Sequence, residues 1–470
     1  ESGNFSGFVV SSNLKSTVPD GVFRRPNAGF WNADYKDVGP RLGLAYRISD
    51  RPMLVLRAGY GIYYQRTSGD LAEQNVGEPP FAVTQMLQGA QNAGATLEEP
   101  FVPALPPNSA YPIFIPRTPE SAIKIAAVDP AIRSPLSQQY SAGIQYEIRP
   151  TLLLETGYVG SAMSHLTGCT QFNQALLPTP QNPVNGQTET TLDNIGLRLP
   201  FEGIAQAGYI CGTRFSGNYN SLQASVTKRL GNGLSLLGSY TWSKTLDYVT
   251  QETSAFDVGF TMNDQTKPRQ SYGVASFDRT NRLVLSFSYD MPRFRWGAAP
   301  LRYALSGWQV SGVLVEQSGL PITVTDSSAG SAFGNLVFTN LAECTGADPA
   351  STGSMFSRIT GPNGFFNSAA FTNPPTVGVA TSSGTPTGFG NCGIGILRGP
   401  GQHNLDLGVI RNFSVGERAK LQFRSEFFNF TNTPDFGLPI SDHSAGGAFG
   451  LITSTVENPR LIQLALKLGF

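Results

Sequence analysis

The sequence has few charged residues and no long hydrophobic run, and each of these shortages excludes a class of protein. Only 14% of the 470 residues are charged, and basic and acidic residues balance at 33 each. Nucleic-acid-binding proteins carry a basic excess, so nucleic acid is not an expected partner. No apolar stretch approaches the roughly 18 residues that a membrane-spanning helix needs. If the chain crosses a membrane, it must therefore do so with the strands of a closed barrel.

Histidine is also scarce. The three histidines, His165, His403 and His443, are scattered through the chain, and we expect them to be ordinary polar residues. No G-x-S-x-G elbow of a hydrolase is present. The sequence therefore predicts no catalytic residues, no metal site and no cofactor, and we do not expect an enzyme.

Cysteine occurs only four times. Cys169 and Cys211 fall in one long irregular segment, and Cys344 and Cys392 fall in another. Pairing within each segment would give two disulfides, which implies an oxidising compartment. The alternative is four free buried thiols. We favour disulfides because both segments are polar and are not expected to supply an apolar core.

What the sequence does contain is a series of segments in which apolar and other residues alternate. A period of two indicates a β-strand with one apolar face. The abundant glycines (52) and prolines (33) suit the turns between such strands. The predicted strands are 38–48, 53–64, 137–148, 152–160, 219–230, 234–244, 281–291, 305–316, 403–413, 420–430 and a final strand that ends at residue 470.

The final strand places Ile462, Leu464, Leu466, Leu468 and Phe470 on one face. A last strand that ends in Phe, with alternate apolar residues before it, resembles the assembly signal of bacterial outer-membrane β-barrels. We therefore expect the barrel-assembly machinery as a partner. The alternative at this point is the closing strand of a soluble sandwich.

The connections between the predicted strands alternate between short and long. The long ones cover about 65–136, 161–217, 245–279, 326–401 and 431–458. All short turns then lie at one end of the sheet, as expected of an outer-membrane barrel with short periplasmic turns and long extracellular loops. We therefore predict an all-β fold, an antiparallel transmembrane β-barrel in the bacterial outer membrane with lipid around it.

The second face of the predicted strands carries charge, which would be costly in the core of a sandwich. In a wide barrel the same residues would line the wet lumen. The lumen-facing candidates are Arg41, Arg57, Glu147, Glu155, Arg282, Asp406, Arg424 and Glu426. Aromatic residues near the strand ends predict two membrane-interface girdles: Tyr63, Tyr64, Tyr158, Tyr240 and Trp242 at the loop end, and Tyr146, Tyr289, Trp308 and Phe470 at the turn end.

About eleven strands are clear, and the first and last of them run in the same direction. An antiparallel barrel cannot close on such a pair. Either Asn4–Ser11 supplies a twelfth strand, or residues 1–470 are the C-terminal part of a larger barrel; we favour the larger barrel.

Several stretches resemble the barrel strands of TonB-dependent receptors, and most closely those of the large Oar-like subgroup. The stretches are Tyr35–Arg66, Ser134–Ile148, Asn218–Asp247, Ser276–Pro292, Leu421–Asn432 and Phe449–Phe470. The resemblance implies a 22-stranded barrel with a plug domain inside it, energised through TonB. Neither a plug nor a TonB box is found in these residues, and we expect both to precede Glu1.

Three functions remain open on the sequence. The first is a receptor for energised uptake of an unidentified extracellular nutrient, the second a passive porin, and the third a barrel that anchors loops for adhesion or assembly. The substrate cannot be read from the sequence. Loop stretches such as Phe356–Phe371 are either contacts for a saccharide or peptide or simply loop packing, and we favour packing for any given residue.

Overall fold

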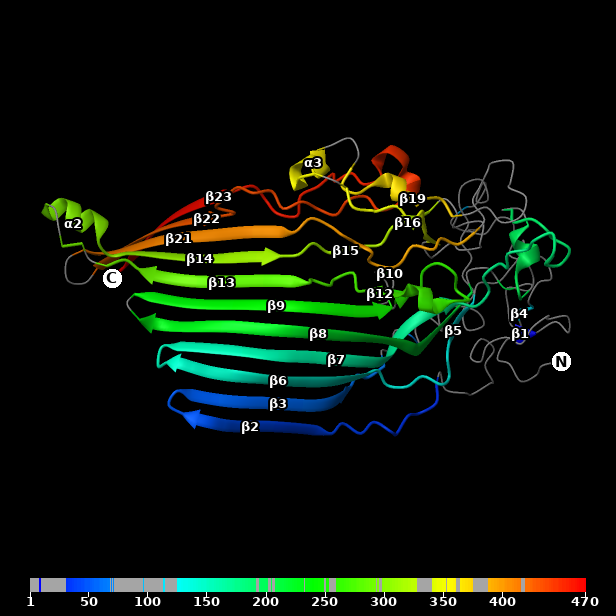
Figure 1. The fold of residues 1–470 in the computed structure, drawn as a ribbon, viewed down its shortest axis with the longest axis horizontal. Helices are drawn as coiled ribbons and strands as arrows, with labels where there is room; N and C mark the ends of the chain where they lie inside the picture. The colour runs from blue at the N-terminus through cyan, green and yellow to red at the C-terminus, as the bar shows by residue number, and fades with distance from the viewer. Residues whose placement is uncertain are drawn as a thin grey trace.

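A computed structural model shows one wide antiparallel β-sheet with all its long connections gathered at one end (Figure 1). None of the helices in the described part of the chain is long and apolar enough to cross a membrane. The structure describes residues 8–9, 31–67, 69, 71, 96, 113–114, 125–191, 194–201, 204, 208–231, 233–248, 251–252, 259–292, 294–295, 298–327, 340–351, 353–360, 364–374, 388–415 and 419–470.

Eleven long strands form the sheet, and each pairs with its predecessor and successor among them, always antiparallel. Strands that follow one another along the chain are therefore neighbours in the sheet. In chain order the strands are β2 (Arg41–Asp50), β3 (Met53–Tyr64), β6 (Leu136–Arg149), β7 (Leu152–Gln171), β8 (Tyr209–Gly231), β9 (Leu234–Tyr248), β13 (Asn281–Asp290), β14 (Trp308–Gln317), β21 (Gln402–Val415), β22 (Ala419–Phe428) and β23 (Leu461–Gly469).

Strands β7 and β8 extend further toward the loop end than their alternation predicts. The register between them shifts around Leu166, and His165 has a positive φ of 55°. A bulge inserts an extra residue and breaks the period of two, so the pattern does not reveal the strand beyond it. Residues 161–171 and 209–217 of the predicted loop 161–217 therefore belong to strands. Short strands pair with these extensions: β5 (Ala126–Val128) with β8, and β11 (Gly259–Phe260) with β7.

The turn end of the sheet carries the C-terminus and helix α2 (Ala299–Leu305), which occupies a connection that we had expected to be a simple turn (Figure 1). This helix covers Arg411, whose guanidinium donates to the carbonyl oxygens of Ala304, at 2.7 Å, and Tyr303. The Arg411 guanidinium also lies 4.4 Å from the centre of the Phe413 ring. Arg411 belongs to the apolar face of the sheet, where an unsatisfied charge would be costly. The helix supplies the acceptors that this arginine needs.

The two edges of the sheet, β2 and β23, each pair with one strand only among the described residues. Both run from the loop end to the turn end (Figure 1). The alternative that Asn4–Ser11 closes the barrel is wrong for the two residues of it that are described. These form β1 (Phe8–Val9), which pairs in parallel with β4 (Ile113–Phe114) and not with the large sheet. The rest of that segment lies outside the described residues.

At the loop end, the described residues of 125–135, 172–208, 251–280, 318–327, 340–374, 388–401 and 429–460 pack together, and we call them the loop assembly. Its regular elements are short: β10 (Gln251–Glu252), β12 (Tyr272–Val274), β15 (Pro321–Ile322), β16 (Thr325–Asp326), β17 (Asn340–Leu341), β18 (Glu343–Cys344), β19 (Phe371–Thr372), β20 (Leu397–Arg398), α3 (Met355–Thr360) and four 3₁₀ turns, Ile195–Arg198, Pro268–Ser271, Ser368–Ala370 and His443–Ala448.

The buried apolar core lies in the loop assembly and on the loop-end extensions of β7 and β8. Its largest cluster surrounds Phe366, which is 1% exposed, and includes Val324, Ala342, Phe365, Ala370, Phe371, Cys392 and Phe449. The Phe366 and Phe449 rings lie 4.8 Å apart in an edge-to-face arrangement. The expectation that the loops are too polar to supply a core was therefore wrong. The apolar residues that form this core are far apart in the sequence, so no local sequence pattern predicts them.

Candidate functional site

Strand register divides the sheet into an apolar face and a polar face. Residues directly opposite each other in paired strands share a face, and the row Arg57, Gly143, Gly157, Gln223, Thr241 and Arg282 crosses six strands. The same arithmetic places all eight charged candidates on this polar face: Arg41, Arg57, Glu147, Glu155, Arg282, Asp406, Arg424 and Glu426. The face is mixed and not uniformly polar, because Leu237 and Val313 also lie on it, both exposed.

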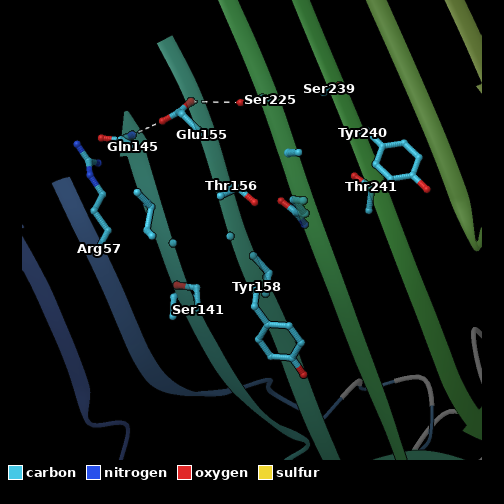
Figure 2. Close-up of a pocket in the computed structure, with 17 residues that line it drawn as sticks. Arg57, Ser141, Gln145, Glu155, Thr156, Tyr158, Ser225, Ser239, Tyr240 and Thr241 are labelled. Carbon is cyan, nitrogen blue, oxygen red and sulfur yellow. Dashed lines mark hydrogen bonds between the residues drawn. The ribbon is translucent and has the colours of Figure 1, made fainter. Parts of the chain in front are cut away.

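Polar side chains of neighbouring strands are linked across this face. Figure 2 shows Glu155 between Gln145 and Ser225, accepting hydrogen bonds from both, that from the Ser225 hydroxyl at 3.4 Å. Near another edge of the sheet, Arg424 and Glu426 form an ion pair at 3.5 Å. These contacts satisfy part of the charge on the face while leaving it hydrated and open.

A shallow hollow of about 320 Å³ lies along the row at Gly143 and Gly157. A Cβ on Gly143 would lie 2.9 Å from the carbonyl oxygen of Thr156, so only glycine lets the two strands approach this closely. Arg57, Glu155 and the hydroxyls around them border the hollow (Figure 2). The two glycines have no side chains to fill the hollow, and its polar lining is suited to contact with water.

A second hollow, of about 480 Å³, lies where the polar face meets the loop assembly. Thr241 lines both hollows, so they adjoin. Two arginines line this second hollow, which we call the upper hollow: Arg279 just before β13 and Arg282 within β13. Arg279 donates to the carbonyl oxygen of Ser318 and, at 3.1 Å, to Oε1 of Gln402. Burial lowers the pKa of Arg279, and the positive charges of Arg398 and Arg282 lower it further, against an opposing effect of Asp435. Sequence reasoning found Arg282 by its alternation but missed Arg279, which follows no strand pattern.

The apolar face carries a row of tyrosines toward the loop end. Tyr140 and Tyr158 both donate to Oδ1 of Asn220, at 3.1 and 2.5 Å, and Tyr240 donates to Asn281 at 2.6 Å. Rings on an apolar surface with hydroxyls bound to amides are suited to the boundary between lipid and water. One predicted member of this girdle was misplaced.

That residue is Tyr63, which the register puts on the polar face. Its ring lies under the Arg41 guanidinium, 4.6 Å from ring centre to cation. Two consecutive tyrosines, Tyr63 and Tyr64, must point to opposite faces of a strand, so they cannot both belong to one girdle.

The last strand presents its apolar alternate residues on the apolar face, as predicted. Ile462, Leu464, Leu466 and Leu468 oppose Phe427, Ser425, Phe423 and Leu421 of β22. All four are more than half exposed, and Phe470 is 99% exposed. These side chains have no protein core to fill, so their apolar character serves contact with something other than the described chain.

Both predicted disulfides are present, Cys169–Cys211 and Cys344–Cys392. The first joins directly opposed residues on the extensions of β7 and β8, and the second reaches from β18 into the buried cluster around Phe366. Within the stretch Phe356–Phe371, Phe365 and Phe371 are buried, which confirms packing for these two residues. The disulfides and the aromatic core together fix the loop assembly.

The histidines are apart from one another in the fold. The Nδ1 atom of His403 contacts Glu316, and that of His443 lies 3.8 Å from Asp326. Among the described residues, no three histidines, cysteines or carboxylates come together in a group that could hold a metal ion.

A comparison with solved structures found outer-membrane proteins at very low sequence identity. The import receptor Fiu from Escherichia coli is 9% identical over 91% of this chain and 34% of its own, with a TM-score of 0.37. The transporter YddB from Escherichia coli is 8% identical over 88% of this chain and 38% of its own, with a TM-score of 0.40. The pyoverdine receptor FpvA from Pseudomonas aeruginosa is 10% identical over 92% of this chain and 36% of its own, also with a TM-score of 0.40. The chain thus spans little more than a third of the length of these structures.

A comparison with curated proteins gave no match. A family model does match, that of the outer membrane beta barrel domain, and it covers residues 1–463. The match agrees with the antiparallel sheet, its apolar face and its exposed final strand. The chain therefore belongs to the outer membrane β-barrel domain family and is a protein of the bacterial outer membrane.

Proposed function

We propose that this chain forms part of the wall of a wide outer-membrane receptor that imports a nutrient with energy supplied through TonB. The observation that carries the proposal is the pair of sheet edges. Both β2 and β23 lack a second partner among the described residues, and both run toward the turn end. Antiparallel closure therefore needs an odd number of further strands.

A second copy of the sheet cannot meet that need. In the same membrane orientation, β23 of one copy would meet β2 of the other in parallel. Outer-membrane barrels are antiparallel, so further strands of different sequence must complete the wall. A barrel with a wall of more than eleven strands encloses a lumen that is either filled with water or occupied by a plug. The polar face with its eight charged residues is suited to line it.

The sequence resemblance to TonB-dependent receptors, and to their Oar-like subgroup, supports the energised mechanism. On this proposal a plug and a TonB box lie in sequence outside these residues, the loop assembly faces the outside of the cell, and no chemical step occurs in the barrel. The packed loop assembly supports a second function, because two disulfides and an aromatic core give it the rigidity of a docking platform for another macromolecule.

The test compares three strains of the native host: the parent, a deletion of this gene, and a strain that lacks TonB. Solutes that disappear from the medium are followed by mass spectrometry. We expect at least one solute whose depletion fails in both mutant strains. A solute that depends on this gene but not on TonB would instead establish a passive channel. Unchanged depletion of every solute, together with lost surface attachment, would establish the docking function.

A further inference from the structure

The upper hollow on the polar face brings two positive charges together, and neither forms an ion pair with a carboxylate among the described residues. Arg282 is exposed, and among the described residues it has no hydrogen bond or ion pair. Arg279 is held by Ser318 and Gln402 alone, both neutral acceptors. A guanidinium has five N–H donors, so Arg279 keeps donors to spare.

Two carboxylates offset this positive charge only in part. Asp278 is fully buried and pairs with Arg398. Asp435 attracts Arg279 without forming an ion pair with it, and one of its oxygens accepts the backbone N–H of His403 at 2.9 Å. Burial lowers the pKa of Arg279 most, and the charges of Arg398 and Arg282 lower it further. An anion in the hollow would therefore relieve an unfavourable arrangement of three arginines.

Apart from Met163, the rest of the lining is aromatic or hydroxylated. The Phe277 ring is 64% exposed, and Tyr219 borders the same hollow. Thr241 and Thr245 add hydroxyls from β9. A ring between Phe277 and Tyr219 would cover exposed apolar surface, while an attached anionic group would reach the arginines.

We propose that the hollow binds an anionic solute that carries a planar ring, with its carboxylate or a similar group held by Arg279 and Arg282. The inference rests on the proposed function only in assigning this solute as the imported substrate. The position favours a solute, since the hollow lies where the polar face meets the loop assembly, the first part of the lumen that an incoming molecule would reach.

The test uses the native protein, purified from outer membranes in detergent, and isothermal titration with three probes. Benzoate has a ring and a charge, benzamide has the ring without the charge, and inorganic phosphate has charge without the ring. We expect benzoate to bind about tenfold more tightly than either of the others, the scale of one charge-assisted hydrogen bond. Equal binding of benzamide and benzoate would overturn the proposal. So would absence of benzoate binding, which is the result expected if an acidic side chain of another segment fills the hollow.

Three variants locate the site. Arg282→Gln should weaken benzoate binding about tenfold, because it removes a charged donor that makes no structural contact. Arg282→Lys should restore part of the affinity. Arg47→Gln is the matched control, since Arg47 pairs with Asp50 at the opposite end of the sheet, and it should change nothing. If Arg282→Gln binds benzoate like the parent, the hollow is not the site. This outcome leaves the TonB dependence of uptake untouched, so the two proposals fail separately.

Discussion

The sheet and the loop assembly are stabilised in opposite ways. In the sheet, apolar side chains face outward: Leu42 is 73% exposed and Leu466 is 71% exposed. In the loop assembly, Phe366 is 1% exposed within a cluster of rings. In the sheet, pairing between strands satisfies the backbone N–H and C=O groups, and lipid covers the apolar face. The loops instead need a buried apolar core of their own, as a soluble domain does. Apolar side chains are thus exposed on the sheet and buried in the loop assembly, and the change occurs at the loop end of the strands.

Buried amides connect the loops to one another. Gln174 donates to Asp264 at 3.1 Å and accepts the backbone N–H of Gln265 at 2.7 Å. Asn263 donates to the carbonyl oxygen of Gly390 at 2.9 Å. Each contact joins connections that belong to different strand pairs, so the loops behave as one body. The two regions should therefore respond to different substitutions.

The largest expected effect is loss of the whole protein, sheet and loop assembly together, from the outer membrane. Replacing Phe470 with Ser should deplete most of the protein from the outer-membrane fraction, because we predict that the terminal ring is part of the assembly signal. Phe470 is 99% exposed, so lost packing within the chain cannot produce this result. The measurement is an immunoblot of separated membranes.

Lys467→Gln serves as its control, because Lys467 lies on the other face of the same strand. It should leave the amount unchanged. Normal membrane levels of the Phe470→Ser protein would mean that the last residue is no assembly signal.

A smaller effect should separate the regions. Phe366→Ala removes a buried ring from the loop core, at a cost of about 3–5 kcal/mol to that core. Limited proteolysis should then cut the loop assembly faster, while circular dichroism still reports the sheet. Leu237→Ala, at an exposed position of the polar face, should change neither. Equal loss of sheet signal in Phe366→Ala would show that the two regions fold as one unit.

The smallest effect depends on pH. Burial acts to raise the pKa of Asp264, but hydrogen bonds from Thr266, Gln174 and Lys267 outweigh it and lower the pKa below its ordinary 3.8. The folded loops thus favour the charged form, and this stabilisation is present at neutral pH and is lost as the pH falls through the lowered pKa.

Asp264→Asn should therefore melt below the parent at pH 7, with a loss of about 1–3 kcal/mol. The difference should be smaller at pH 3, because below the ordinary pKa of 3.8 the unfolded chain binds a proton at this carboxyl and the advantage of the charged form begins to be lost. A gap that stays constant between the two pH values would contradict this role of the carboxylate.

Much of the sheet follows from the sequence alone. Strand β3 covers Met53–Tyr64 as predicted, and the other strands of the sheet begin or end within a few residues of their predicted limits wherever alternation persists. Alternation also assigned the eight charged residues to one face. This succeeds because the side-chain period of a strand is a local property, set by the backbone and independent of distant residues.

The loops could not be read in this way. Cys169 and Cys211 were expected in an irregular segment, yet they face each other on extended strands beyond a bulge. Helix α2 was also missed, and its carbonyl groups accept hydrogen bonds from Arg411, which lies more than a hundred residues later in the sequence.

The sequence by itself determined the alternating parts of the strands, their two faces and the alternation of the final strand, and it favoured the cysteine pairs that the structure contains. The tertiary structure decided which loop residues form a core, that Arg279 joins Arg282 at one hollow, and that both sheet edges have no second partner among the described residues. The physical reason is the sequence separation of the residues involved. Alternation and turns depend on neighbouring residues, whereas a core, a charge cluster and an open sheet edge form only when distant segments meet.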